Sequence, residues 1–195
     1  MPTDTADRLK DAVLAAMREH GYAGTSMQDL LRSTGVSSSS MYHFFPGGKE
    51  ALVAAAVRSS GAASAGEIAA VMTNFDPPTA ITRIFDAAAA EMASHDFTLG
   101  CPIGVPATEA PTTAPEVQEA VAEVFDAWAD AYASGLRAHG FDAATSDSIA
   151  RAIIAVYEGS VTVARATRST EPYRDGAALL ISRLRPNPTS EGDHS

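Results

Sequence analysis

The chain contains 195 residues, of which 46% are hydrophobic, and it carries a formal net charge of −10. No window approaches the roughly eighteen apolar residues of a membrane-spanning helix, and the acidic N-terminus has no apolar signal core. The single cysteine, Cys101, has no partner for an internal disulfide, as is usual in a reducing compartment. We therefore expect a cytoplasmic protein that does not enter a membrane.

The abundance of alanine and the shortness of the β-branched runs favour an all-α fold, for which we predict about nine helices. The first helix should span residues 5–20, because Leu9, Val13 and Met17 recur at helical spacing between charged side chains. His20-Gly21 should end it.

The stretch Thr25–Lys49 has the outline of a helix-turn-helix. Thr25 is predicted to cap a short helix, with Gln28 completing a capping box, and Gly35 should end that helix in a left-handed conformation. Ser37 should then cap a second helix over residues 38–44.

The second helix has a polar side suited to DNA. Its first turn contains serines, whose hydroxyls can donate hydrogen bonds to phosphates and base edges. Lys49 follows at the start of the next helix, where a cation and backbone amides suit a phosphate. The predicted DNA-contacting residues are Thr25, Ser26, Ser37, Ser38, Ser39, Ser40, Tyr42, His43 and Lys49.

These motifs resemble the tetracycline-repressor (TetR) family of bacterial transcription regulators. The resemblance rests on Thr25-Ser26-Met27, Gly35-Val36-Ser37, Met41-Tyr42-His43-Phe44-Phe45-Pro46 and Lys49-Glu50-Ala51-Leu52, and it covers the first quarter of the chain. It implies phosphate contacts by Ser40, Tyr42 and Lys49 and base contacts by Ser38 and Ser39. Further along, Leu99-Gly100-Cys101-Pro102-Ile103-Gly104 resembles a motif of the LmrA/YxaF-like branch.

The resemblance also implies a domain plan. A three-helix DNA-binding domain should occupy residues 1–48, a helical effector-binding and dimerisation domain residues 49–185, and a disordered tail residues 186–195. Residues 1–50 hold five basic and six acidic residues, a net charge of −1, which leaves −9 on the remainder. A nearly neutral DNA-binding domain predicts modest non-specific affinity for DNA.

The larger domain should contain helices over residues 49–72, 79–95, 103–109, 116–139, 145–167 and 171–184. Ser59-Ser60-Gly61 lies in the middle of the first of these and is a predicted weak point, since glycine and serine lower helix propensity.

Aromatic residues on these helices predict a cavity for a small effector. The candidate ligand-binding residues are Phe85, Met92, Trp128, Tyr132 and Tyr157, although the same residues could form ordinary core. Few cations lie on these faces, so an uncharged or cationic flat aromatic ligand is expected. Cys101 has no basic neighbour in sequence and is expected to be an inert thiol.

The last two helices should pair with their copies in a homodimer, as the family resemblance implies. The predicted interface residues are Ile154, Val161, Tyr173, Ala177, Leu180 and Leu184.

The sequence contains no GxGxxG, Walker, CxxC or HExxH motif, so no cofactor and no metal site is predicted. The favoured function is a dimeric, ligand-responsive regulator, most simply a repressor, that binds palindromic double-stranded DNA and is released by a small hydrophobic effector. A helical adaptor with a degenerate DNA-binding domain and a helical enzyme are the alternatives.

Overall fold

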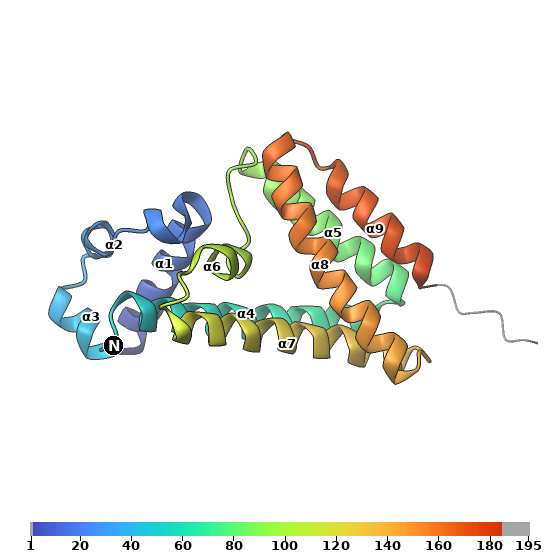
Figure 1. Ribbon diagram of the computed structural model, residues 1–195, viewed down its shortest axis with the longest axis horizontal. Helices are drawn as coiled ribbons and strands as arrows, with labels where there is room; N and C mark the ends of the chain where they lie inside the picture. The colour runs from blue at the N-terminus through green and yellow to red at the C-terminus, as the bar shows by residue number, and fades with distance from the viewer. Residues whose placement is uncertain (1, 185–195) are drawn as a thin grey trace, which may run out of the picture.

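The computed structural model describes residues 2–184, which form helices joined by turns and short loops (Figure 1). In chain order the helices are α1 (Pro2–Gly24), α2 (Met27–Thr34), α3 (Ser38–Phe44), α4 (Lys49–Asn74), α5 (Pro77–Ser94), α6 (Gly104–Glu109), α7 (Pro115–Ala138), α8 (Ala143–Thr167) and α9 (Glu171–Arg183). The predicted all-α fold is therefore confirmed, with nine helices among the described residues. The predicted tail, 186–195, lies outside them.

We call α1–α3 the head and α4–α9 the body. Figure 1 shows the head at one end of the long helices α4 and α7, with α5, α8 and α9 packed above their other half and α6 next to α1. The first helix buries Leu9, Val13 and Met17, as its spacing predicted. Gly21, at φ 77°, interrupts α1 where the helix was expected to end.

Helices α4 and α7 run side by side in the same direction. The Glu116 amide donates to Glu50 Oε1 over 2.9 Å near their starts, and Arg58 pairs with Glu123 over 2.6 Å further along. Their backbones approach closely at Gly61, where an added Cβ would lie 2.2 Å from a Val124 methyl carbon.

This packing corrects the expectation that Gly61 is a weak point. The helix continues through Ser59-Ser60-Gly61 without interruption, and Gly61 is buried. The Trp128 Nε1 group donates to the Gly61 carbonyl over 3.2 Å. Glycine stands here because only a residue without a side chain lets the two helices meet.

Helices α5 and α8 each begin two residues before the predicted position, because an aspartate side chain caps each of them. Asp142 accepts a hydrogen bond from the Thr145 amide over 3.0 Å and caps α8, which was expected to open at Thr145 or Ser146. Asp76 caps α5 through the Thr79 amide, with Pro77 in the first turn. Between residues 2 and 184, none of the helices has the length and apolar character needed to cross a membrane.

Candidate DNA-binding head and effector cavity

Helix α2 begins at a different cap from the one predicted. The Ser26 hydroxyl accepts a hydrogen bond from the Asp29 amide over 3.3 Å, and Gly35 ends the helix at φ 67°, in the left-handed conformation expected. Thr25 is buried, and its hydroxyl donates to the Gly21 carbonyl over 2.8 Å. Thr25 therefore fixes the turn between α1 and α2, which corrects its predicted cap role, and its predicted DNA contact stays a prediction.

Helix α3 has one face in the core and the other in solvent. Ser37 caps it as predicted, accepting from the Ser40 amide over 3.2 Å. Met41 and Phe45 are buried against the rest of the head. The opposite face presents exposed polar and aromatic side chains: Ser37, Ser38, Ser39, Tyr42 and His43, with Ser40 half-buried.

Tyr42 is 56% exposed, an unusual position for a large aromatic side chain. It lies one residue beyond the buried Met41, so its direction is set by the helix and not by contacts of its own ring. The exposed serines beside it are bonded to one another: Ser37 Oγ lies 3.0 Å from Ser39 Oγ and 2.9 Å from Ser40 Oγ. The result is a rigid polar ridge on a short helix.

Lys49 is held by the head itself. Its ammonium donates to the carbonyls of Tyr22, over 2.6 Å, and Thr25, over 2.8 Å, and it lies 4.4 Å from the centre of the Tyr22 ring. Partial burial lowers the pKa of Lys49. Since an ammonium has three N–H donors, one is left for a phosphate, and the predicted phosphate contact stays a prediction.

The other cations of the head are also engaged. Arg8 donates to the Thr34 carbonyl, Arg32 pairs with Asp29 over 2.7 Å, and Lys10 pairs with Asp7 over 2.7 Å. The head therefore presents hydroxyls and amides with little unpaired positive charge.

A half-open cavity of about 370 Å³ lies in the body, where it adjoins the head. Four of the five predicted ligand-binding residues, Met92, Trp128, Tyr132 and Tyr157, line it. Phe85 does not, which corrects that prediction: its ring packs edge-on against Tyr157, with centroids 5.7 Å apart, and supports the wall from behind. The volume suits a small organic molecule.

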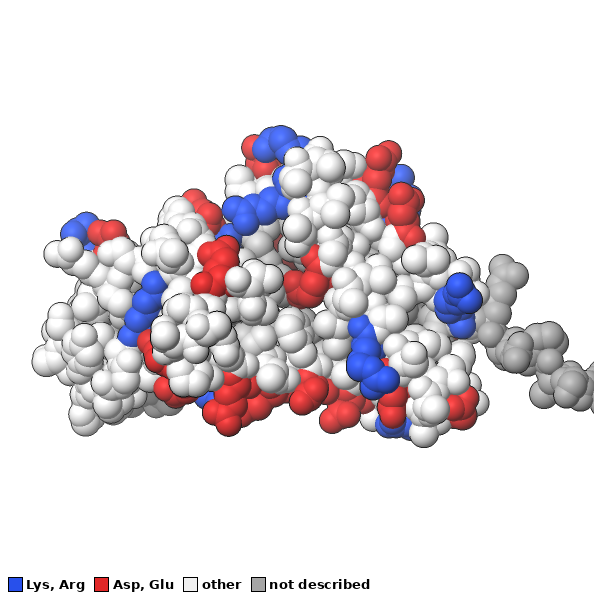
Figure 2. Space-filling view, viewed as in Figure 1, with Lys and Arg blue, Asp and Glu red and all other residues white. Residues whose placement is uncertain are grey.

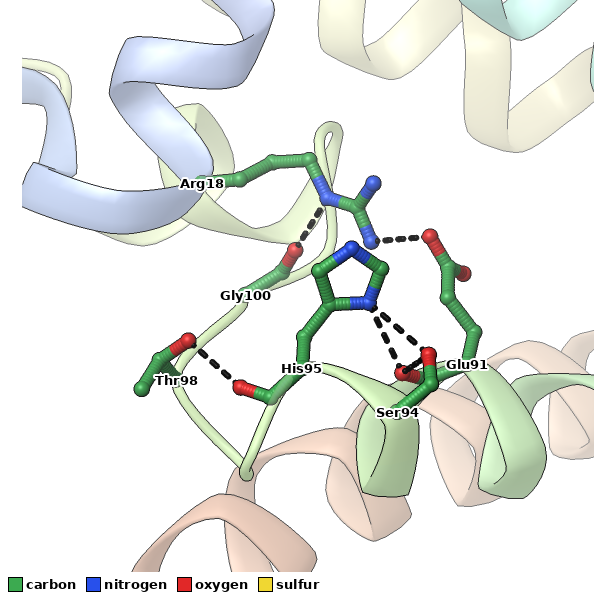
Figure 3. Close-up of polar contacts among 6 residues, drawn as sticks. All are labelled: Arg18, Glu91, Ser94, His95, Thr98 and Gly100. Atoms are coloured by element: carbon green, nitrogen blue, oxygen red, sulfur yellow. Dashed lines mark hydrogen bonds and ion pairs between the residues drawn. The ribbon is translucent and has the colours of Figure 1, made fainter.

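Charged residues that were not among the predicted ligand-binding residues also line this cavity. Arg18 comes from α1 in the head, Arg83 and Glu91 from α5 and Glu67 from α4. Figure 3 shows Arg18 extended between the Gly100 carbonyl and the Glu91 carboxylate. Two arginines, Arg18 and Arg83, therefore line a cavity in which few cations were expected.

The predicted dimer-interface residues face the chain's own interior. Ile154, Val161 and Tyr173 line the cavity, and Ala177, Leu180 and Leu184 are buried in the core. Five of the six are buried and have little surface to offer a second chain, which corrects those positions; Ile154 is half-buried, and its place in an interface stays a prediction. The exposed apolar side chains on α8 and α9 are instead Val163 and Leu179, at 47% and 59% exposure.

A second hollow, of about 840 Å³, lies between α6, α7 and α8. Figure 2 shows acidic atoms recessed in this part of the surface. Glu158 is among its lining residues, and its Oε1 atom is buried with no hydrogen-bond partner among the described residues. Burial raises the pKa of Glu158.

Cys101 lies in the wall shared by the two hollows and is buried. Burial and the neighbouring Glu158 raise the pKa of its thiol well above the ordinary value. Such a thiol is a poor nucleophile at neutral pH, in agreement with the expectation that it is inert.

Two histidines lie at helix ends and contact carbonyls of the last turn. His95 Nδ1 is 3.0 Å from the Glu91 carbonyl oxygen and His139 Nδ1 is 2.9 Å from that of Gly135. Within the described residues no cluster of three potential metal ligands occurs.

Comparisons with known proteins agree with this architecture. Residues 10–56 match the family model described as bacterial regulatory proteins, tetR family, and residues 77–178 match the model for the C-terminal domain of LmrA/YxaF-like transcriptional regulators. The HTH-type transcriptional regulator Rv0196 of Mycobacterium tuberculosis is 30% identical, covering 91% of this chain and 95% of that protein. LmrA of Bacillus subtilis is 25% identical over 87% of this chain and 90% of its own.

Solved structures show the same fold. The regulatory protein TetR from Rhodobacter sphaeroides superposes with a TM-score of 0.79 at 22% identity, covering 91% of this chain and 97% of that one. FadR from Bacillus subtilis, solved in complex with stearoyl-CoA, superposes with a TM-score of 0.64 at 12% identity, over 92% and 99%.

The chain is a helix-turn-helix transcription regulator, and it belongs to the TetR family. Within that family it is a member of the LmrA/YxaF-like branch, as the Leu99–Gly104 motif predicted. Proteins of this family regulate transcription and are not enzymes, which removes the helical-enzyme alternative.

Proposed function

We propose that this protein is a homodimeric repressor that binds a palindromic operator through α3 and is released from it by a small hydrophobic effector. The observation that carries the proposal is the polar ridge of α3, which stands clear of the head while Met41 and Phe45 hold the helix from below. Helix α3 would enter the major groove, with Ser38 and Ser39 against base edges and Tyr42 and Ser40 against phosphates.

Dimerisation is proposed through the outer faces of α8 and α9. Val163 and Leu179 are the large apolar residues exposed on these two helices, and Val163 lies with the small residues Ala155 and Gly159 along the open hollow beside α6 and α7. We propose that a two-fold axis through this surface places the two heads on the same side of the dimer. Operator half-sites should then be about 34–36 Å apart, or a multiple of that distance.

The effector is proposed to occupy the cavity lined by Trp128, Tyr132 and Tyr157. FadR, a regulator of the same fold, was solved with an acyl-CoA, which supports a ligand-binding role for the body. An effector that prefers the DNA-free conformation shifts the population away from the operator, and DNA must weaken effector binding by the same factor. A protein with this function binds chromosomal DNA, so we propose that it is cytoplasmic.

The test begins with selection of a bound duplex from a random DNA library by the full-length chain. We expect an enriched palindrome and a dimer bound to it, measured by fluorescence anisotropy and sedimentation. The matched variant Ser38→Ala with Ser39→Ala should lose preference for that palindrome and keep its fold. If no duplex is enriched, the chain is an adaptor with a degenerate head, and the proposal fails.

A further inference from the structure

One side chain of the head reaches across into the body beside the effector cavity. Arg18 Nε donates to the Gly100 carbonyl over 2.9 Å, and Arg18 Nη2 contacts Glu91 Oε1 over 2.8 Å (Figure 3). The Gly100 amide donates back to the Arg18 carbonyl over 2.9 Å. These three contacts, which we call the Arg18 latch, join α1 to α5 and to the loop that precedes α6.

The latch is also a part of the cavity wall. Arg18, Glu91 and Gly100 all line the hollow that contains Trp128. A guanidinium has five N–H donors in a planar fork, and only Nε and Nη2 are bonded within residues 2–184. In Figure 3 no dashed line joins the second terminal nitrogen to the other residues drawn. The other arginine that lines the cavity, Arg83, has its Cζ atom 4.0 Å from the centre of the Phe75 ring, a contact that covers one face of its guanidinium and does not join the head to the body.

We propose that Arg18 is the polar anchor of the effector: the cavity takes a flat apolar molecule bearing a carbonyl or carboxylate oxygen, which binds Arg18 and opens the latch. This inference rests on the proposed function, because it names the chemistry of the effector and the contact through which it acts.

The solvent exposure of Arg18 and Glu91 favours a ligand with a hydrogen-bond acceptor over a cationic ligand. The Glu91 side chain is 48% exposed, so it regains water easily when a ligand oxygen replaces it. Arg18 is 25% exposed, so a cationic ligand that captured Glu91 would leave a largely covered guanidinium without its carboxylate. Exchange of one acceptor for another keeps the arginine paired, and arginine binds planar carboxylates and carbonyls through its fork.

The loop attached to the latch is held in an unfavourable conformation. Asp96 and Phe97 have φ angles of 53° and 58°, which non-glycine residues rarely adopt. Arg168, the residue that follows α8, contacts the loop from the other side and donates to the Asp96 carbonyl over 3.2 Å. Loss of the Arg18 contacts therefore removes the link between this loop and α1, while the Tyr22 amide still donates to Glu109 Oε2 of α6 over 2.8 Å.

The test uses three naphthalenes of similar size: 2-naphthoate, with a carboxylate; 2-acetylnaphthalene, with a carbonyl; and 2-ethylnaphthalene, with no acceptor. Binding to the full-length protein is measured by equilibrium dialysis, and release of the selected operator by anisotropy. We expect at least one acceptor probe to bind about tenfold tighter than 2-ethylnaphthalene, the effect of one charge-assisted hydrogen bond.

Arg18→Gln should abolish that preference, whereas Glu91→Gln, which removes the competing carboxylate charge, should increase it several-fold. Arg58→Gln, at an ion-paired arginine away from the cavity, is the control and should change neither. Arg18→Lys, which keeps the charge without the fork, replaces Arg18→Gln if circular dichroism shows that the latter is unfolded, and should lose most of the preference.

The inference is overturned if the folded Arg18 variant keeps the acceptor preference, if only cationic 9-aminoacridine binds, or if none of the probes binds at millimolar concentration. The proposed function fails separately, by the absence of any enriched operator. If the protein binds an operator but its preference for acceptor probes does not depend on Arg18, the proposed function stands and only the proposed effector chemistry is contradicted.

Discussion

At the scale of single residues, burial separates side chains that look alike in sequence. Thr25 and Ser26 are adjacent hydroxyl residues at the start of α2, but Thr25 is buried on the Gly21 carbonyl and Ser26 caps the helix. Tyr22 and Tyr42 differ in the same way, since Tyr22 is buried beneath Lys49 and Tyr42 is exposed on α3. Exposure thus decides which of them is available to DNA.

Tyr42→Phe should weaken operator binding about three- to tenfold, the value of one hydrogen bond to a phosphate, with no change in thermal stability. Tyr22→Phe is the matched control: it keeps the ring beneath Lys49 and should leave operator affinity unchanged. Fluorescence anisotropy of the labelled operator measures both. An equal loss in the two variants would contradict a direct contact by Tyr42.

Glu158 should make the stability of the protein depend on pH. Burial raises its pKa in the folded state, so its contribution to stability is full below the unfolded value, about 4.3, and is lost as the pH rises through the folded value. Glu158→Gln should therefore raise the free energy of unfolding at pH 7 by about 1–2 kcal/mol, because it removes a charge whose Oε1 has no partner.

The gain should be much smaller at pH 4 and approach zero near pH 3, where the carboxyl is protonated in both states. Urea unfolding at several pH values measures it, and Glu67→Gln, at an exposed glutamate, should show no such gain. A gain for Glu158→Gln that is the same at pH 4 and pH 7 would mean that ionisation is not its cause.

At the scale of helices, the parallel pair α4 and α7 depends on glycines that carry no side chain into the contact. Gly61 faces Val124, and Gly135 faces Met72, where an added Cβ would lie 2.5 Å from the Met72 Cβ. Helix propensity alone would favour alanine at both positions. Packing between helices therefore overrides local preference along α4.

Gly61→Ala should lower the free energy of unfolding by about 1–3 kcal/mol, the usual cost of overpacking, despite the better helix propensity of alanine. Gly66→Ala, on the same helix with open space around it, should instead raise it by about 0.5–1 kcal/mol. Urea unfolding compares the two. The addition of Val124→Ala should recover part of the loss; if it does not, the contact with α7 is not the cause.

At the scale of the whole molecule, the outer faces of α8 and α9 are where a second chain is expected. Val163→Asp with Leu179→Asp should place charges in the interface and convert the dimer to a monomer, at a cost of several kcal/mol. Sedimentation at micromolar concentration measures this.

Tyr42→Asp is the matched control, since it places the same charge at an exposed apolar residue of the head: it should abolish operator binding and leave the dimer intact. Leu180→Asp, at a buried position of α9, should unfold the chain and not merely dissociate it. A dimer that persists in the Val163 and Leu179 double variant would place the interface on another surface.

The sequence by itself determined the helices, the helix-turn-helix and the family. These depend on local signals: the spacing of Leu9, Val13 and Met17, the cap at Ser37 and the left-handed Gly35 all act within a few residues. The aromatic residues of α7 and α8 were placed at the cavity for the same reason, because each lies on a continuous apolar stripe.

Only the tertiary structure decided what depends on residues far apart in the chain. Helix α8 is apolar on two sides, and nothing in its periodicity says that Ile154 and Val161 face the cavity while Val163 faces outward. Arg18 reaches a cavity whose tryptophan is Trp128, and Gly61 meets Val124. Such contacts follow from how whole helices pack. The energy of a buried contact depends on both residues that form it, and the sequence of one helix does not identify the residue it meets on another.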